Sequence, residues 1–108
     1  MPSTPILRRL ARLEAQTDTP DGSGGFIKSW TKLADHRVAI TPTSGVERFE
    51  GSQQTSRVTH RIRLRCTRAL RPRADHRFTV GTRQFDIRAV FDTDGRGRFL
   101  TCLCEEHP

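Results

Sequence analysis

Arginines stand at alternate positions in the segment "RVTHRIRLR", residues 57–65, where Arg61, Arg63 and Arg65 follow Arg57. Alternate residues of a strand share one face, so the last three guanidinium groups would lie about 7 Å apart along a strand. Arginine binds phosphates and carboxylates through paired hydrogen bonds. The spacing therefore predicts a surface for a partner with repeated negative charges, either a nucleic-acid backbone or an acidic protein.

The overall charge agrees with an anionic partner. The chain has a net charge of +7, with 17 arginines and two lysines. Contact with a duplex backbone is favoured over stacking on single strands, because the chain has one Trp and no Tyr. The alternative is a solvated face whose charges are offset by carboxylates of a neighbouring strand or subunit. The chain offers five candidates for that role: Glu47, Glu50, Asp86, Glu105 and Glu106.

Signals of catalysis are weak in this sequence. There is no nucleophile elbow, no HExxH motif and no phosphate-binding loop. The segment "DTDGRG" places Asp92, Asp94 and Gly97 as a calcium loop would, but Leu103 stands where that loop needs a bidentate Glu. We therefore interpret this segment as a hairpin turn and expect no enzyme activity.

The cysteines and histidines also favour structural roles. Cys66, Cys102 and Cys104 form an odd set without a disulfide pattern, and the C-x-C spacing is not that of a zinc knuckle. On a strand, Cys102 and Cys104 would share one face. His60 lies among apolar residues and is interpreted as a hydrogen-bonded structural histidine. We expect no metal and no cofactor.

The arginine row must lie on a strand, because the residues between the arginines are mostly apolar. The expected inner face of this strand is Val58, His60, Ile62, Leu64 and Cys66. Two hairpins are predicted to follow it. One reverses at Gly81 and Thr82, and the other at 92–97. The C-terminal half is therefore expected to be an antiparallel meander.

The N-terminal half is less uniform. Residues 6–16, "ILRRLARLEAQ", fit either a helical stripe or a strand with Ala11, Leu13 and Ala15 on one side. The segment that follows, rich in Pro, Gly and Ser, predicts a long flexible loop at about 18–26.

Three further elements are predicted between this loop and the arginine row. β-Branched and aromatic residues favour short strands at 26–30 and 36–42. The spacing of Ser44 and Glu47 is that of a capping box and predicts a short helix at about 45–54.

Together these elements predict a mainly β chain with a single domain over residues 1–108. The expected architecture is a small antiparallel β-barrel or sandwich of about six strands with one short helix. Apolar residues make up only 33% of the chain, which predicts a thin core and leaves oligomerisation open, since neighbouring subunits could cover part of the apolar surface. No leader or membrane segment is expected, and the cysteine usage indicates a reducing compartment.

The order of these segments resembles that of a known family. An Arg-rich opening is followed by "DGSGGFIKSW", "HRVAITPTSGVERFEGSQQ", "THRIRLR", "RQFDIRAVFD" and a closing "CEE". This order is similar to that of the head-tail joining, or head-closure, proteins of tailed bacteriophages and phage-like gene-transfer particles. The similarity extends from about Leu7 to Glu106.

The resemblance implies a structural role. Such proteins are small β-barrels that form a ring, expected here with six subunits or alternatively twelve, between the portal or adaptor ring and the tail terminator or tail tube. The ring extends the channel for double-stranded DNA, helps to retain packaged DNA and docks the tail. The implied location is the neck of a particle assembled in the bacterial cytoplasm.

The resemblance also suggests which residues make contacts. Residues 10–16 become the first strand, with Ala11, Leu13 and Ala15 inward. The projecting elements would be the loop and the acidic segment after it. The resulting ring or tail contact candidates are Asp21, Gly22, Gly24, Gly25, Glu47, Arg48 and Glu50, and the DNA-channel or anionic-partner candidates are Arg57, Arg61, Arg63 and Arg65.

Two other functions remain open at this point. A free-standing protein could lay a β-ribbon with its arginine row on duplex DNA, which predicts strong, salt-dependent binding by the isolated chain. A small hydrolase or toxin is the least favoured alternative, because no acid, base or nucleophile is clustered in the sequence.

Overall fold

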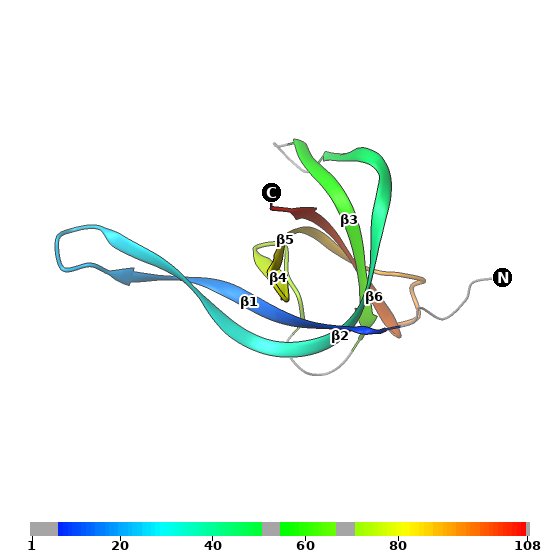
Figure 1. Cartoon of the computed structure of the whole chain (residues 1–108), viewed down its shortest axis with the longest axis horizontal. Coiled ribbons are helices and arrows are strands. Elements are labelled where there is room, and N and C mark those ends of the chain that lie inside the picture. Colours follow the sequence, from blue (N-terminus) through cyan, green and yellow to red (C-terminus); the bar gives the residue numbers. More distant parts are fainter. Residues whose placement is uncertain (1–6, 51–54, 67–70, 108) are drawn as a thin grey trace.

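Six antiparallel strands form one sheet that closes on itself as a barrel, in the order β1-β2-β3-β6-β5-β4 (Figure 1). This computed structural model describes residues 7–50, 55–66 and 71–107. The strands are β1 (Arg9–Pro20), β2 (Phe26–Glu50), β3 (Thr55–Arg65), β4 (His76–Val80), β5 (Arg83–Asp92) and β6 (Phe99–Glu106). The predicted mainly β, antiparallel fold class is confirmed.

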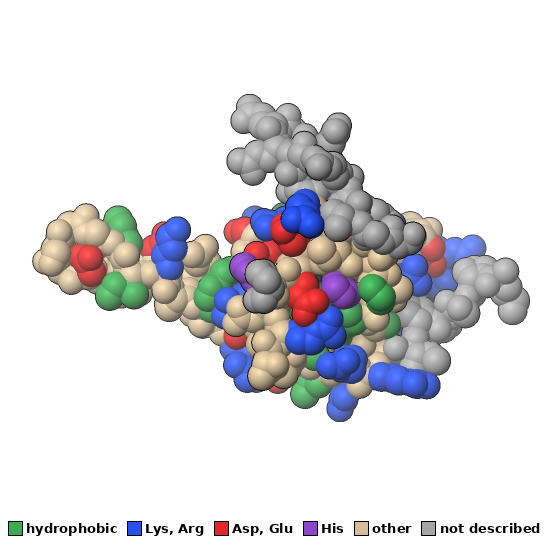
Figure 2. Space-filling model, turned by 45° about the horizontal axis from the view of Figure 1, so that its top comes forward, with side chains coloured by type: hydrophobic (Ala, Val, Ile, Leu, Met, Phe, Trp, Pro, Cys, Tyr) green, Lys and Arg blue, Asp and Glu red, His purple; other side chains and the backbone are tan. Residues whose placement is uncertain are grey.

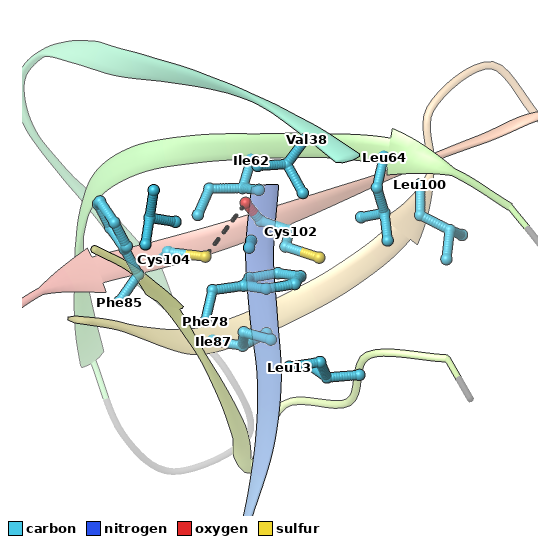
Figure 3. Packing of buried hydrophobic residues seen from close by; sticks show 12 residues of the cluster. Leu13, Val38, Ile62, Leu64, Phe78, Phe85, Ile87, Leu100, Cys102 and Cys104 are labelled. Atoms are coloured by element: carbon cyan, nitrogen blue, oxygen red, sulfur yellow. Dashed lines mark hydrogen bonds between the residues drawn. The ribbon is translucent and has the colours of Figure 1, made fainter. Parts of the chain in front are cut away.

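The core is built from the inward positions of all six strands. Figure 3 shows its side chains gathered inside the barrel, with Phe78 of β4 opposite Phe85 of β5 in the strand register. Both rings are fully buried, as are Leu13 and Ile62. Each such side chain contributes about 1.5–3 kcal/mol on burial. The barrel interior is therefore a packed core.

The alternation predicted for β3 is confirmed. Val58, Ile62 and Leu64 are buried, and His60 and Cys66 of the same face are half-buried. Cys102 and Cys104 both lie in the core, as their spacing predicted. Their positions on β6 pair with Ile62 and His60 of β3.

The first strand is confirmed and carries a bulge. Ala11 and Leu13 are fully buried, as expected for inward positions. The register with β2 shifts between Leu13 and Glu14, so Glu14 is also buried and Ala15 only half-buried. A bulge lets consecutive residues turn to the same side of a sheet and bends the strand.

The helix predicted at 45–54 is wrong for its first six residues. β2 continues to Glu50, and Glu47 pairs with Val58 of β3, while residues 51–54 lie outside the described part of the chain. Pairing with β3 supplies the backbone hydrogen bonds that the capping-box signal assigned to a helix. The ladder is interrupted between Pro42 and Glu47, where proline has no N–H to donate.

The strands predicted at 26–30 and 36–42 form a single strand, because β2 runs unbroken through both. The loop predicted at about 18–26 is shorter in the structure. β1 and β2 pair as far as Pro20 and Phe26, so only residues 21–25 connect them. The turn is held by Asp21, whose Oδ1 accepts hydrogen bonds from the backbone N–H groups of Ser23 and Gly25.

A two-stranded arm projects from the barrel. We define it as residues 16–30, which pair only within the β1–β2 hairpin, because β4 pairs with β1 only at Arg12–Ala15 and β3 pairs with β2 only from Val38 onward. Figure 1 shows the arm extending to one side, and it gives the molecule its long axis of 57 Å against 29 and 26 Å for the other two.

No described residues form a helix long and apolar enough to cross a membrane.

Replacing Leu13 with Ala tests the packed interior. Leu13 is fully buried, so Leu13→Ala should lower the free energy of unfolding by about 2–5 kcal/mol. The matched control is Leu10→Ala on the same strand, where Leu10 is 52% exposed and the expected loss is below about 0.5 kcal/mol. Urea denaturation measures both, and equal losses would contradict the described burial of β1.

Candidate functional site

The arginine row lies on the outer face of β3. Arg57, Arg63 and Arg65 are exposed, and Arg61 is half-buried. The buried residues between them fix this orientation, since alternate positions of a strand point to opposite sides of the sheet. The sequence therefore placed the row correctly on the outside of the barrel.

In the described register, the partners of Arg61, Arg63 and Arg65 on β2 and β6 are not carboxylates, and Arg57 pairs with Arg48 of β2. Arg61 pairs with Thr41 and Leu103, and Arg63 pairs with Ala39 and Thr101. Arg65 pairs with Phe99, and its guanidinium lies 5.3 Å from the centre of that ring.

Three of the five carboxylates considered as partners of the row bind other cations. Glu106 receives two hydrogen bonds from Arg83, at 2.7 and 3.0 Å. Glu105 receives one from Arg88 at 3.0 Å. Asp86 lies 3.7 Å from the guanidinium of Arg88 and 2.7 Å from the imidazole of His107. The other two, at 47 and 50, pair in register with Val58 and Thr55 of β3.

The positive surface is wider than the row. Arg12 of β1 and Arg37 of β2 are exposed and alternate with the buried residues of their own strands. We call the surface formed by Arg12, Arg37, Arg61, Arg63 and Arg65 the basic face. Arg12 and Arg37 were missed in the sequence, although their alternation with Ala11, Leu13 and Val38 could have indicated them.

The other predicted contact residues fall into two separate places. Asp21, Gly22 and Gly24 are exposed in the turn that ends the arm, and Gly25 is half-buried there. Gly22 and Gly24 have φ of 84° and 86°, a conformation that favours glycine. Glu47, Arg48 and Glu50 lie at the end of β2, which Figure 1 places away from the tip of the arm.

Charge is distributed unevenly between the barrel and the arm. On the side shown in Figure 2, basic side chains gather on the barrel and few lie on the arm.

An ion pair joins β1 to β4 next to the base of the arm. The buried carboxylate of Glu14 accepts hydrogen bonds from Arg77 Nε at 2.6 Å and from the Thr79 hydroxyl at 2.8 Å. The Arg77 guanidinium also stacks on the ring of Trp30 at 4.1 Å. Burial alone would raise the pKa of Glu14, but these hydrogen bonds and the charges of Arg77 and Arg12 outweigh it and lower the pKa below 4.5.

A second cluster of polar side chains surrounds His60. Its Nδ1 lies 3.0 Å from the Thr59 hydroxyl, and its Nε2 lies 3.4 Å from Arg83 and 3.7 Å from Glu106. Burial lowers the pKa of His60, and the Arg83 charge acts in the same direction against that of Glu106. The hydrogen bond from Arg83 lowers the pKa of Glu106. This cluster holds β3, β5 and β6 together, and its carboxylate is a poor proton acceptor.

The two buried cysteines, Cys102 and Cys104, are poorly suited to metal binding. Burial raises the pKa of the Cys102 thiol to about 12, and the pKa of Cys104 is raised in the same way. The Cys104 thiol donates to the Cys102 carbonyl at 3.6 Å (Figure 3). Among residues 7–50, 55–66 and 71–107, no three His, Cys, Asp or Glu side chains are placed to hold a metal ion.

Two comparisons relate this chain to known proteins. The family model described as phage head completion protein matches residues 2–107. A solved structure titled "Virion of native gene transfer agent (GTA) particle" contains a chain that is 32% identical, with a TM-score of 0.72. The match covers 96% of this chain and 98% of that one. Among curated proteins, none is similar enough to count as a match.

Replacing Glu14 with Gln tests the ion pair between β1 and β4. The pKa of Glu14 is lowered in the folded state, so its contribution to stability is present above its ordinary pKa of 4.5 and is lost as the pH falls through the lower folded value. Glu14→Gln should cost about 1–3 kcal/mol at pH 7 and should lose less stability than the wild type between pH 5 and about pH 3.

The measurement is the melting temperature as a function of pH, followed by the fluorescence of Trp30. The control is Asp18→Asn, which removes an exposed carboxylate from the arm. Its melting temperature should fall on acidification almost as that of the wild type does. The assignment of this ion pair fails if Glu14→Gln and the wild type lose the same stability on acidification.

Proposed function

This chain belongs to the family of phage head completion proteins, and from that premise we propose that it is a ring-forming subunit at the neck of a phage-like particle. The ring lies between the portal or adaptor ring and the tail terminator or tail tube. It extends the channel for double-stranded DNA, helps to retain packaged DNA and docks the tail. The particle is assembled in the bacterial cytoplasm.

The basic face is the observation that carries this proposal. Its arginines lie on three adjacent strands, β1, β2 and β3, and the side chains of Arg12, Arg37, Arg63 and Arg65 are exposed. Like charges so arranged repel one another, and a partner with negative charges relieves that repulsion. A ring repeats the face around its axis, so that weak contacts of single subunits add up.

Both double-stranded DNA and an acidic neighbouring ring fit the basic face. A lumen that bound phosphates at every arginine would slow the passage of DNA, because the affinity rises with each phosphate contact. We therefore infer that only part of the row Arg57, Arg61, Arg63 and Arg65 faces the channel. The remainder contacts an anionic protein surface.

The projecting parts of the chain are placed for protein contacts. The turn with Asp21, Gly22, Gly24 and Gly25 lies at the tip of the arm, and Glu47, Arg48 and Glu50 lie at the far end of β2. Both segments therefore extend toward neighbours of the ring. We infer a structural role without catalysis. The strongest candidate for an acid or base, His60, is instead held in place by contacts with Thr59, Arg83 and Glu106.

Complementation of particles that lack this chain tests the proposal. Adding the purified protein to such particles should restore tail attachment and protect the packaged DNA from nuclease. The proposal fails if the protein restores neither and instead binds duplex DNA tightly on its own at low salt. That result would support the free-standing DNA-binding protein.

Replacing Arg63 with Gln tests the basic face. Arg63 is exposed, so Arg63→Gln should leave the melting temperature unchanged. It should weaken the retention of DNA by the assembled ring. It should also reduce the slope of log affinity against log salt by about 0.9 for each phosphate that the variant no longer neutralises. The measurement is nuclease protection and DNA binding at several salt concentrations.

The matched control is Arg96→Gln, which removes the same charge from the exposed turn between β5 and β6. An equal effect of both substitutions would show that net charge, and not the basic face, governs binding. No effect of Arg63→Gln on DNA together with failure to attach to the adaptor ring would assign Arg63 to a protein contact.

A further inference from the structure

Four large apolar side chains are exposed among the described residues, and they lie in two parts of the chain. Phe26 and Ile27, at the tip of the arm, are 66% and 59% exposed. Leu10 and Phe91, on the barrel, are 52% and 46% exposed. The arm thus ends in an apolar tip, and the barrel wall offers two apolar positions that such a tip could cover.

Beyond its base, where Trp30 stacks on Arg77, the arm makes no strand pairing with the described strands of its own barrel. Beyond Ala15 and Thr31, its two strands pair only with each other, and one face carries hydroxyl groups, such as Thr17, which lies 2.9 Å from the Thr31 hydroxyl. A two-stranded ribbon alone is marginally stable in water. Covering its tip with another molecule would therefore stabilise both the ribbon and the contact.

Charge selects between the two apolar positions on the barrel. The tip carries Asp18 and Asp21 against one nearby cation, Lys28, which pairs with Asp18 in the register. The turn after Phe91 carries Asp92 and Asp94 against Arg96 and Arg98, with Arg98 3.1 Å from Asp94, so it has no net positive charge to attract the acidic tip.

Leu10 has the opposite surroundings. Its neighbours on the outer face of the same strand are Arg8 and Arg12, and its direct partner across β2 is Arg37. The carboxylate of Asp35, which is opposite Arg12 in the register, lies 2.7 Å from Lys32. All three arginines are exposed. We call Leu10 with these three arginines the Leu10 patch.

We propose that the tip of the arm of one subunit docks on the Leu10 patch of the next copy of this chain. The tip and the patch stand at opposite ends of β1, about 33 Å apart along the strand, so one subunit cannot join its own two surfaces. The contact is heterologous and, repeated with a rotation, closes a ring. In a ring of six with β1 lying in the plane of the ring, the contact points would lie about 33 Å from the axis, because the side of a regular hexagon equals its radius.

This inference rests on the proposed ring and assigns the partner of the arm. It also assigns Arg12 and Arg37 of the basic face to the subunit contact. Arg61, Arg63 and Arg65 on β3 are then left for DNA or for another ring.

Chemical cross-linking in assembled particles tests the inference. Phe26→Cys and Leu10→Cys are introduced together, with Cys66→Ser because Cys66 is half-buried, while Cys102 and Cys104 are buried. A short bismaleimide should then give a ladder of cross-linked chains that ends at the closed ring. The matched control replaces Leu10→Cys with Phe91→Cys and should give at least fivefold less product.

A charge exchange tests the same contact without cysteines. Arg37→Glu and Asp18→Arg should each lower ring formation about two- to fivefold, and the double variant should recover it, because the new charges again attract. Phe26→Ser with Ile27→Ser should abolish the contact and leave the barrel folded, since both side chains are exposed.

The outcomes separate this inference from the proposed function. Particles that contain the chain and keep their DNA, but give no cross-link between positions 10 and 26, overturn the docking of the arm alone. Equal cross-linking through positions 91 and 10 overturns it as well. Absence of the chain from particles with normal tails and DNA overturns both proposals.

Discussion

The alternation of β3 between core and surface is the constraint on which the rest of the structure depends. Val58, Ile62 and Leu64 fill the barrel, so the arginines between them can only point outward. A slip of one residue in register would bury guanidinium groups and expose the apolar row, at a large cost in free energy. The same residues that form the core therefore fix the direction of the basic face.

The distribution of carboxylates completes this arrangement. Glu14 and Glu106 are bound to Arg77 and Arg83 inside the subunit and join β1 to β4 and the C-terminal strand to β5. These two carboxylates therefore bind arginines that hold strands together. Glu14 also lies 3.6 Å from Arg12 of the basic face. The arm nevertheless pairs only with itself beyond its base, and the basic face is exposed, which is the expected state of a part that is stabilised on assembly.

Much of this organisation was predictable because it depends on local patterns. The period-two pattern of β3, the reversal at Gly81 and the turn after Asp92 are each determined by residues close in sequence. The turn after Asp92 is indeed held by local contacts, since the side chain of Asp92 accepts hydrogen bonds from the backbone N–H groups of Gly95 and Gly97. The candidate arginines of β3 followed from the same pattern.

The features that were missed depend on contacts between distant parts of the chain. Local signals at Ser44 and Glu47 predicted a helix, but pairing with β3 keeps β2 extended to Glu50. The bond between Glu14 and Arg77 joins residues 63 positions apart, and no local spacing indicates it. The contribution of Arg37 to the basic face likewise required the sheet order that places β1, β2 and β3 side by side.

A cryo-EM reconstruction of the neck of particles that contain this chain would test the central claim most directly. The account predicts a ring of these subunits between head and tail, with Arg61, Arg63 and Arg65 within contact distance of DNA phosphates or of carboxylates of an adjacent ring. A neck that lacks the chain, or a ring whose β3 arginines face only solvent, would contradict it.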